Sequence, residues 1–178
     1  MVIGRKKLAK IMRWSYCLFW INSFWIGGAS AQIVLNKENP SLNVGKSLFV
    51  LEDKKGNLDI NQVSSKDFEG EFKPSEQEAF NVGVSSSAFW LRLDLQSKDT
   101  QIKDWLLYSP YSFLDEVTLY QQNEKGTWKG LSLGLEQKFD ERPIKHRYII
   151  FPFTLKDTLV HRFFIKIQSQ TPIQFPLY

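Results

Sequence analysis

Apolar and polar side chains alternate in several short segments of this chain. Leu91, Leu93 and Leu95 occupy every second position of one segment, and Val117 and Leu119 repeat the pattern in another. Alternation with a period of two places the apolar side chains on one face of a β-strand. The pattern predicts strands over residues 47–52, 90–95, 105–109, 116–121, 128–133, 148–154 and 163–168.

Polar turns separate these segments, among them Lys54-Lys55-Gly56-Asn57 and Asn123-Glu124-Lys125-Gly126. After residue 31 we find no helical stripe of ten or more residues. The sequence therefore predicts an all-β fold, an antiparallel β-sandwich, of which the jelly roll is the commonest exported form. Residues 62–78 are the least regular part, and we predict a loop or edge excursion there with one short strand at 68–72.

The first 31 residues have the pattern of a secretory signal peptide. Basic residues precede an apolar stretch from Trp14 to Ile26, and Ala29-Ser30-Ala31 has the small-residue spacing of a cleavage site. The apolar stretch is shorter than the roughly 20 residues of a spanning helix. We expect cleavage after Ala31 and export of one domain, residues 32–178, to the periplasmic side of the inner membrane. An uncleaved signal anchor is the alternative.

The signal segment also changes what the charge means. The chain has a formal net charge of +4, but the first 31 residues hold five of its 23 Lys and Arg and none of its 19 Asp and Glu. The remaining 18 basic and 19 acidic residues give −1, which argues against nucleic acid as a partner, because phosphate binding needs a clustered basic face. The only cysteine, Cys17, lies in the apolar stretch, so the exported domain is predicted to lack disulfides and to depend on its core.

Several motifs follow one another in the order found in one receptor family. Residues 80–83 and 87–92 read FNVG and SAFWLR, 114–120 read LDEVTLY, and 139–143, 150–153, 164–169 and 175–177 read FDERP, IFPF, FIKIQS and FPL. In this order and spacing, the chain from about Leu48 to Tyr178 resembles the extracellular type 2 domain of seven-transmembrane receptors with diverse intracellular signalling modules.

The resemblance implies a sandwich similar to carbohydrate-binding modules, a carbohydrate or other small ligand, and attachment to the membrane through C-terminal transmembrane segments. It also implies a cytoplasmic output such as a histidine kinase or a diguanylate cyclase. Because the chain stops at Tyr178, we expect either a fragment of a receptor or a free-standing version. The chain departs from the family pattern at Gly134-Leu135, where Gly-Asp is usual, and at Lys166, where an Arg with its planar fork is usual.

Catalytic and metal-binding patterns find no support in the sequence. His146 and His161 lack the spacing of a metal motif, and Ser85-Ser86-Ser87 is not flanked as a nucleophile elbow. Carboxylates are numerous, but sequence alone does not place a pair of them in a cleft. We predict no enzymatic activity for this chain, although a full-length receptor would carry its output enzyme, and we predict no metal and no cofactor.

Five residues are predicted to bind a ligand: Arg92, Tyr111, Phe113, Asp115 and Arg142. Tyr111 and Phe113 lie in a Pro-containing connection and are candidates for an exposed aromatic platform, whereas Trp90 is expected to be buried. Arg92 and Asp115 either form a salt bridge that ties strand to loop or present the Arg to an acidic ligand. For Arg142 the same two interpretations stand beside a solvated turn.

The main hypothesis is a periplasmic ligand-sensing domain of a bacterial membrane receptor. One alternative is a protein-interaction module that forms a homodimer or binds another protein through an exposed patch or a sheet edge. Another is a secreted jelly-roll hydrolase, which requires a pair of carboxylates in one cleft.

Overall fold

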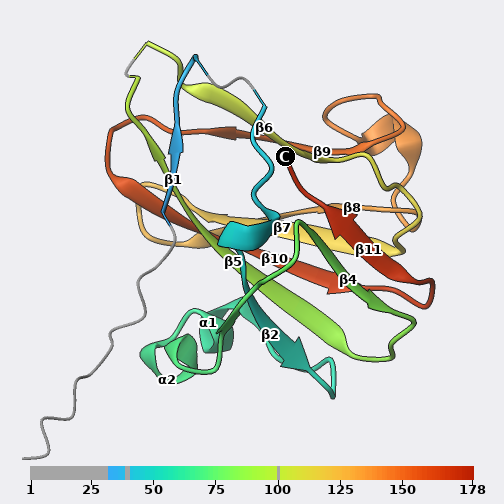
Figure 1. The fold of residues 1–178 in the computed structure, drawn as a ribbon. Helices are drawn as coiled ribbons and strands as arrows, with labels where there is room; N and C mark the ends of the chain where they lie inside the picture. The colour runs from blue at the N-terminus through green and yellow to red at the C-terminus, as the bar shows by residue number, and fades with distance from the viewer. Residues whose placement is uncertain (1–31, 39–40, 100) are drawn as a thin grey trace, which may run out of the picture.

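The computed structural model describes residues 32–38, 41–99 and 101–178, so the predicted signal peptide lies outside them. These residues form mostly β structure with a few short helices (Figure 1). The strands are β1 (Gln32–Leu35), β2 (Phe49–Asp53), β3 (Lys73–Pro74), β4 (Ala79–Gly83), β5 (Ala88–Ser97), β6 (Asp104–Ser109), β7 (Glu116–Gln122), β8 (Trp128–Leu133), β9 (Ile149–Thr154), β10 (Val160–Gln168) and β11 (Ile173–Pro176). The helices are α1 (Ile60–Val63) and α2 (Lys66–Glu69), with the 3-10 turns η1 (Gly45–Ser47) and η2 (Phe139–Glu141). No helix in the described ranges is long and apolar enough to cross a membrane.

The larger layer is a seven-stranded sheet. Six strands follow one another in the order β3-β2-β5-β10-β7-β8, and each of these neighbours is antiparallel. The same edge of β5 has two partners, because β2 pairs with its first half and β1 runs parallel to its second half. β5 therefore has partners along both edges.

The second layer contains two strand pairs that the end of the chain joins. β4 pairs with β11 and β6 pairs with β9, both antiparallel. Tyr178 follows β11, donates from its backbone N to the Tyr108 carbonyl at 3.0 Å and accepts from the Tyr108 N at 2.9 Å. The backbone hydrogen bonds of this layer thus link its strands in the order β4, β11, β6, β9.

The main core lies between the two layers. Leu91, Leu93 and Ile165 point into it from the large sheet, and Phe151 and Phe175 point into it from the second layer. The predicted sandwich with alternating strands is confirmed in its antiparallel, mostly β character. The jelly-roll connectivity stays a prediction.

A second, smaller cluster covers part of the outer face of the large sheet. It consists of Leu51, Val63, Phe72, Trp90 and Phe164, and the segment that carries α1 and α2 covers it. The expectation that Trp90 is buried is confirmed, and β5 is buried on both faces.

The structure confirms strands at all seven predicted segments, with ends that differ by up to three residues. The strand predicted at 68–72 is wrong. Lys66–Glu69 form α2 instead, and only Lys73–Pro74 pair as β3, because this excursion lies over the sheet face and buries Phe72 there.

Candidate functional site

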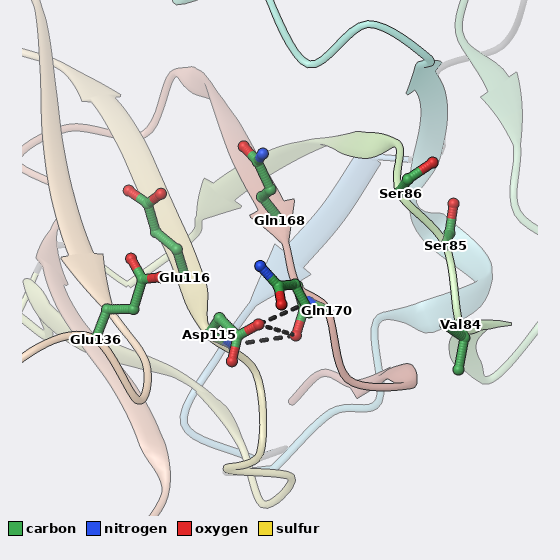
Figure 2. A pocket seen from close by; sticks show the side chains of 9 residues that line it. Val84, Ser85, Ser86, Asp115, Glu116, Glu136, Gln168 and Gln170 are labelled. Carbon is green, nitrogen blue, oxygen red and sulfur yellow. Dashed lines mark hydrogen bonds between the residues drawn. The ribbon is translucent and has the colours of Figure 1, made fainter.

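Four loops meet at one end of the sandwich and form a groove of about 580 Å³. They are the β4–β5 loop, the start of β7 with the residue before it, the segment just after β8, and the end of β10 with the turn to β11 (Figure 2). The groove, called the end groove below, is lined by Val84, Ser85, Ser86, Asp115, Glu116, Glu136, Gln168, Ser169 and Gln170.

Gly134 places Glu136 opposite Asp115. Its φ of 138° lies in a region that side-chain-bearing residues rarely adopt, and a Cβ there would lie 2.3 Å from the Asp115 carbonyl oxygen. The close approach lets Leu135 N donate to the Leu114 carbonyl at 2.9 Å and Glu136 N donate to the Asp115 carbonyl at 3.1 Å. The β7–β8 pairing therefore continues past the strand ends and brings two acidic residues to the groove. Glu136 thus supplies a carboxylate to the groove two positions after Gly134.

The Asp115 side chain is fixed by the turn after β10. Its Oδ2 accepts hydrogen bonds from the Ser169 Oγ at 3.2 Å and from the Gln170 backbone N at 2.6 Å (Figure 2). The Asp115 backbone N in turn donates to the Ser169 Oγ at 3.2 Å. These bonds tie the start of β7 to the segment that leads into β11.

The charged residues that line the end groove are all acidic. Three carboxylates line it, from Asp115, Glu116 and Glu136, and the lining contains no Lys, Arg or His. Hydroxyl and amide groups of Ser85 and Gln168 add hydrogen-bond donors and acceptors. Such a surface favours ligands with hydroxyl or amino groups and repels anions.

Two of the predicted binding residues, Tyr111 and Phe113, lie in the loop before β7 and contact the turn before β11. The Tyr111 hydroxyl donates to the Pro172 carbonyl at 3.2 Å, and its ring meets that of Phe113 edge to face at 5.7 Å. The Phe113 carbonyl accepts from the Thr171 hydroxyl, and the Phe113 side chain is 63% exposed. Phe113 is thus an exposed aromatic ring in the loop before β7, while Tyr111 is half-buried and holds this loop in place. Neither residue lines the end groove.

Arg142 holds the turn at Gly134 that brings Glu136 to the end groove. Its guanidinium donates to the Gly134 carbonyl at 2.8 Å and to the His146 carbonyl at 3.1 Å, and it lies 5.5 Å from the Phe139 ring. These contacts fasten the β8–β9 loop to the residue that positions Glu136. In this arrangement Arg142 is a positioning residue.

Arg92 lies apart from the other four predicted residues. It is 6% exposed on the outer face of the large sheet, with its guanidinium 4.4 Å from the Phe49 ring and 5.1 Å from the Phe72 ring. Burial lowers the pKa of Arg92 and the charge of Arg162 adds to this effect, while Asp94 and Glu69 oppose it.

The structure does not bring Arg92 and Asp115 together. Arg92 pairs across the sheet with Phe164 of β10, whereas Asp115 binds Ser169, five positions further along the chain. The salt bridge, one of the two interpretations of this pair, therefore does not form between Arg92 and Asp115, because the two residues lie at different levels of the sheet.

Sequence reasoning missed several groove residues, notably Glu136, Gln168 and Gln170. The glycine at position 134 is a sequence signal for a turn, because glycine readily adopts a positive φ. The pairing of distant loops has no local signal in the sequence. Neither His146 nor His161 lines the end groove, and within the described ranges no group of His, Cys, Asp and Glu is arranged to hold a metal.

A β-rich scaffold with a polar groove built from loops at one end is typical of recognition domains. A family model described as 7TMR-DISM extracellular 2 matches residues 45–178. The chain therefore belongs to this family, the extracellular sensor domain 2 of seven-transmembrane receptors with diverse intracellular signalling modules. This domain is a sensor module of membrane receptors rather than a catalytic domain. No curated protein matches the chain.

Proposed function

We propose that this chain is the periplasmic ligand-sensing domain of a bacterial membrane receptor and that the end groove binds its ligand. The observation that carries the proposal is the convergence of three carboxylates with amide and hydroxyl groups in a groove whose lining contains no Lys, Arg or His. The ligand is a small molecule rich in hydroxyl or amino groups, with carbohydrates and amino sugars as the leading class.

The turn that lines the end groove leads directly into β11, the last strand, so that binding there can affect the last residues of the chain. Gln168, Ser169 and Gln170 line the groove, and the residues that follow them form β11 and then pair with β6 through Tyr178. A ligand that prefers one arrangement of this turn shifts the population of domain conformations by its difference in affinity. In a receptor, that shift biases the membrane segments and the output module.

The test is to measure binding of glucosamine, cellobiose and glucuronate to the purified protein by calorimetry, with a Glu136→Gln variant. We expect glucosamine or cellobiose to bind and glucuronate not to bind. For an amine-bearing ligand, loss of the Glu136 charge should weaken binding by about ten-fold, the range of a charge-assisted hydrogen bond. Glu76→Gln is the matched control, since Glu76 is exposed and does not line the groove. Equal affinity of the Glu136→Gln variant and the wild type would contradict the assignment of the groove.

A protein-interaction role is the second candidate, and the outer face of β6 and β9 supports it. Leu106 and Pro152 are exposed there, and the Tyr108 ring stacks on those of Tyr148 and Tyr178 at 6.4 and 5.4 Å. Exposed apolar and aromatic side chains on one face are typical of interfaces. This role predicts a mass in sedimentation that rises with concentration and returns to that of a monomer in Leu106→Lys. A monomer at all concentrations would remove the homodimer.

The hydrolase alternative retains a geometric basis, because three carboxylates share the end groove. A glycosidase needs two carboxyl groups that flank the bond to be cleaved. The sensor family argues against it. Release of nitrophenol from aryl glycosides, lost in Glu136→Gln, would establish it.

A further inference from the structure

A second groove lies on the outer face of the large sheet, beside α1. Its volume is about 340 Å³, within the range of about 300–1,000 Å³ that is usual for small-molecule sites. The residues that matter here are Ser64, Asp94, Gln122, Trp128, Arg162 and Phe164. We call it the lateral groove. It shares none of its lining residues with the end groove.

One row of side chains across four neighbouring strands forms its floor. Asp94 of β5 pairs with Arg162 of β10, and Gln122 of β7 pairs with Trp128 of β8. The neighbouring pair Phe163 and Gln121 places Arg162 next to Gln122. At about 4.8 Å per strand the row spans about 14 Å. It has a charged pair at one end, an amide in the middle and an indole at the other end.

At the charged end of the row, two carboxylates bind Arg162 and compensate its charge. Arg162 donates from Nε and Nη2 to the two oxygens of Asp94 at 2.9 and 3.2 Å, and from Nη1 to Glu69 at 3.2 Å. Asp94 is only 4% exposed. The hydrogen bond to Asp94 raises the pKa of Arg162, so the guanidinium stays charged. Since carboxylates compensate this charge on two sides, the groove has little attraction for an anion, yet Arg162 keeps further N–H groups that can donate to hydroxyls.

The aromatic end is fixed in orientation. Trp128 donates from its indole Nε1 to the Ser64 Oγ at 3.1 Å, and its ring meets Phe164 edge to face at 5.3 Å. Ser64, at the end of α1, and Phe164 of β10 thus hold the half-buried indole in the lining of the groove. A fixed aromatic ring offers a stacking surface at low cost in conformational entropy.

We propose that the lateral groove is a second ligand site, which binds a neutral sugar ring with its apolar face on Trp128 and its hydroxyls on Arg162 and Gln122. The pairing of an aromatic surface with a neutralised ion pair suits a molecule that has an apolar face and a polar edge but no net charge. The proposal is independent of the end groove, whose lining is acidic and has no aromatic ring.

The experiment titrates the protein with maltotriose, cellotriose and trigalacturonate, and follows tryptophan fluorescence and the indole N–H signal of Trp128 by NMR. At least one neutral trisaccharide should bind and shift the Trp128 signal, and trigalacturonate should not. Gln122→Ala, at an exposed side chain, should weaken binding by about five-fold, the effect of one lost hydrogen bond. Trp128→Ala should weaken binding by at least about ten-fold, and Trp128→Phe should weaken it less because a ring remains.

Gln174→Ala serves as the control and should bind as the wild type does, because it removes an exposed amide from β11 that lines neither groove. Glu136→Gln reports separately on any sugar bound in the end groove, and the shift of the Trp128 signal should persist in this variant. Circular dichroism verifies that each variant is folded. The proposal is overturned if neither neutral trisaccharide binds at about 10 mM, if trigalacturonate binds equally well, or if binding survives both Gln122→Ala and Trp128→Ala. Sugar binding that only Glu136→Gln abolishes would also overturn it, while supporting the end groove.

Discussion

At the scale of single residues, Gly134 determines how the end groove is built. Its φ of 138° and the 2.3 Å that would separate a Cβ from the Asp115 carbonyl oxygen exclude any side chain without backbone movement. We expect Gly134→Ala to lower the free energy of unfolding by about 2 kcal/mol or more, from backbone strain and the clash together. Urea denaturation measures this loss.

Gly70→Ala is the matched control for this prediction. Gly70 has a φ of −77°, and no atom lies within 4 Å of a Cβ placed there. The substitution should be neutral or stabilise by up to about 1 kcal/mol, because alanine reduces the entropy of the unfolded chain. If Gly134→Ala were no worse than Gly70→Ala, the close approach of the two backbones would be refuted.

An exposed pair, Asp157 and His161, adds a pH dependence to stability. The His161 Nε2 lies 2.7 Å from the Asp157 Oδ1, and hydrogen bonds from His161 and then from the Leu159 backbone N hold the pKa of Asp157 below its ordinary value of 3.8. A depressed carboxyl pKa contributes stability above the unfolded value, and this contribution disappears as the pH falls through the folded value. Thermal unfolding should therefore show Asp157→Asn less stable than the wild type at pH 6, with the difference vanishing toward pH 2. Glu76→Gln should show no such convergence.

At the scale of elements, the excursion between β2 and β4 depends on caps and anchors rather than on periodicity. Asp59 Oδ1 accepts from the Gln62 N at 2.9 Å, and Gln62 Oε1 accepts from the Asp59 N at 2.9 Å, which closes a capping box at the start of α1. Val63 is the buried anchor of this helix in the outer cluster. Val63→Ala should lower the free energy of unfolding by about 2 kcal/mol through lost burial and a cavity.

The control for Val63→Ala is Val84→Ala. Val84 is 73% exposed, so the same substitution there should change stability by less than about 0.5 kcal/mol. Because Ser64, which caps the end of α1, binds the indole in the lateral groove, Val63→Ala should increase hydrogen exchange at the Trp128 indole as well. An unchanged indole signal would show that α1 does not hold the ring.

The same elements show how far sequence reasoning reaches. Seven strands alternate over five residues or more and were predictable, whereas β1 and β11 have four residues each and β4 contains two polar or glycine interruptions, Asn81 and Gly83. Helices of four residues, such as α1 and α2, are too short for a 3.6-residue period to show. In the site, Asp115 was predictable as a charged residue at the start of a core strand, but Glu136 and Gln170 join it only through the pairing of loops far apart in the chain.

At the scale of the whole molecule, the last residues of the chain hold the second layer together. Leu177 is fully buried in the main core, its carbonyl accepts from the Val44 N at 3.0 Å, and the next residue, Tyr178, joins β11 to β6. Leu177→Ala should therefore lower the free energy of unfolding by about 3 kcal/mol, as expected for truncation of a buried leucine. It should also increase amide exchange at Tyr108 and Tyr178 more than in the large sheet, because the contact between the two strand pairs loosens first. Leu159→Ala, at a side chain that is 67% exposed, should stay within about 0.5 kcal/mol of the wild type. If amide exchange rose uniformly across both layers, the second layer would not be a separable unit, and the proposed route from the end groove through β11 would lose its basis.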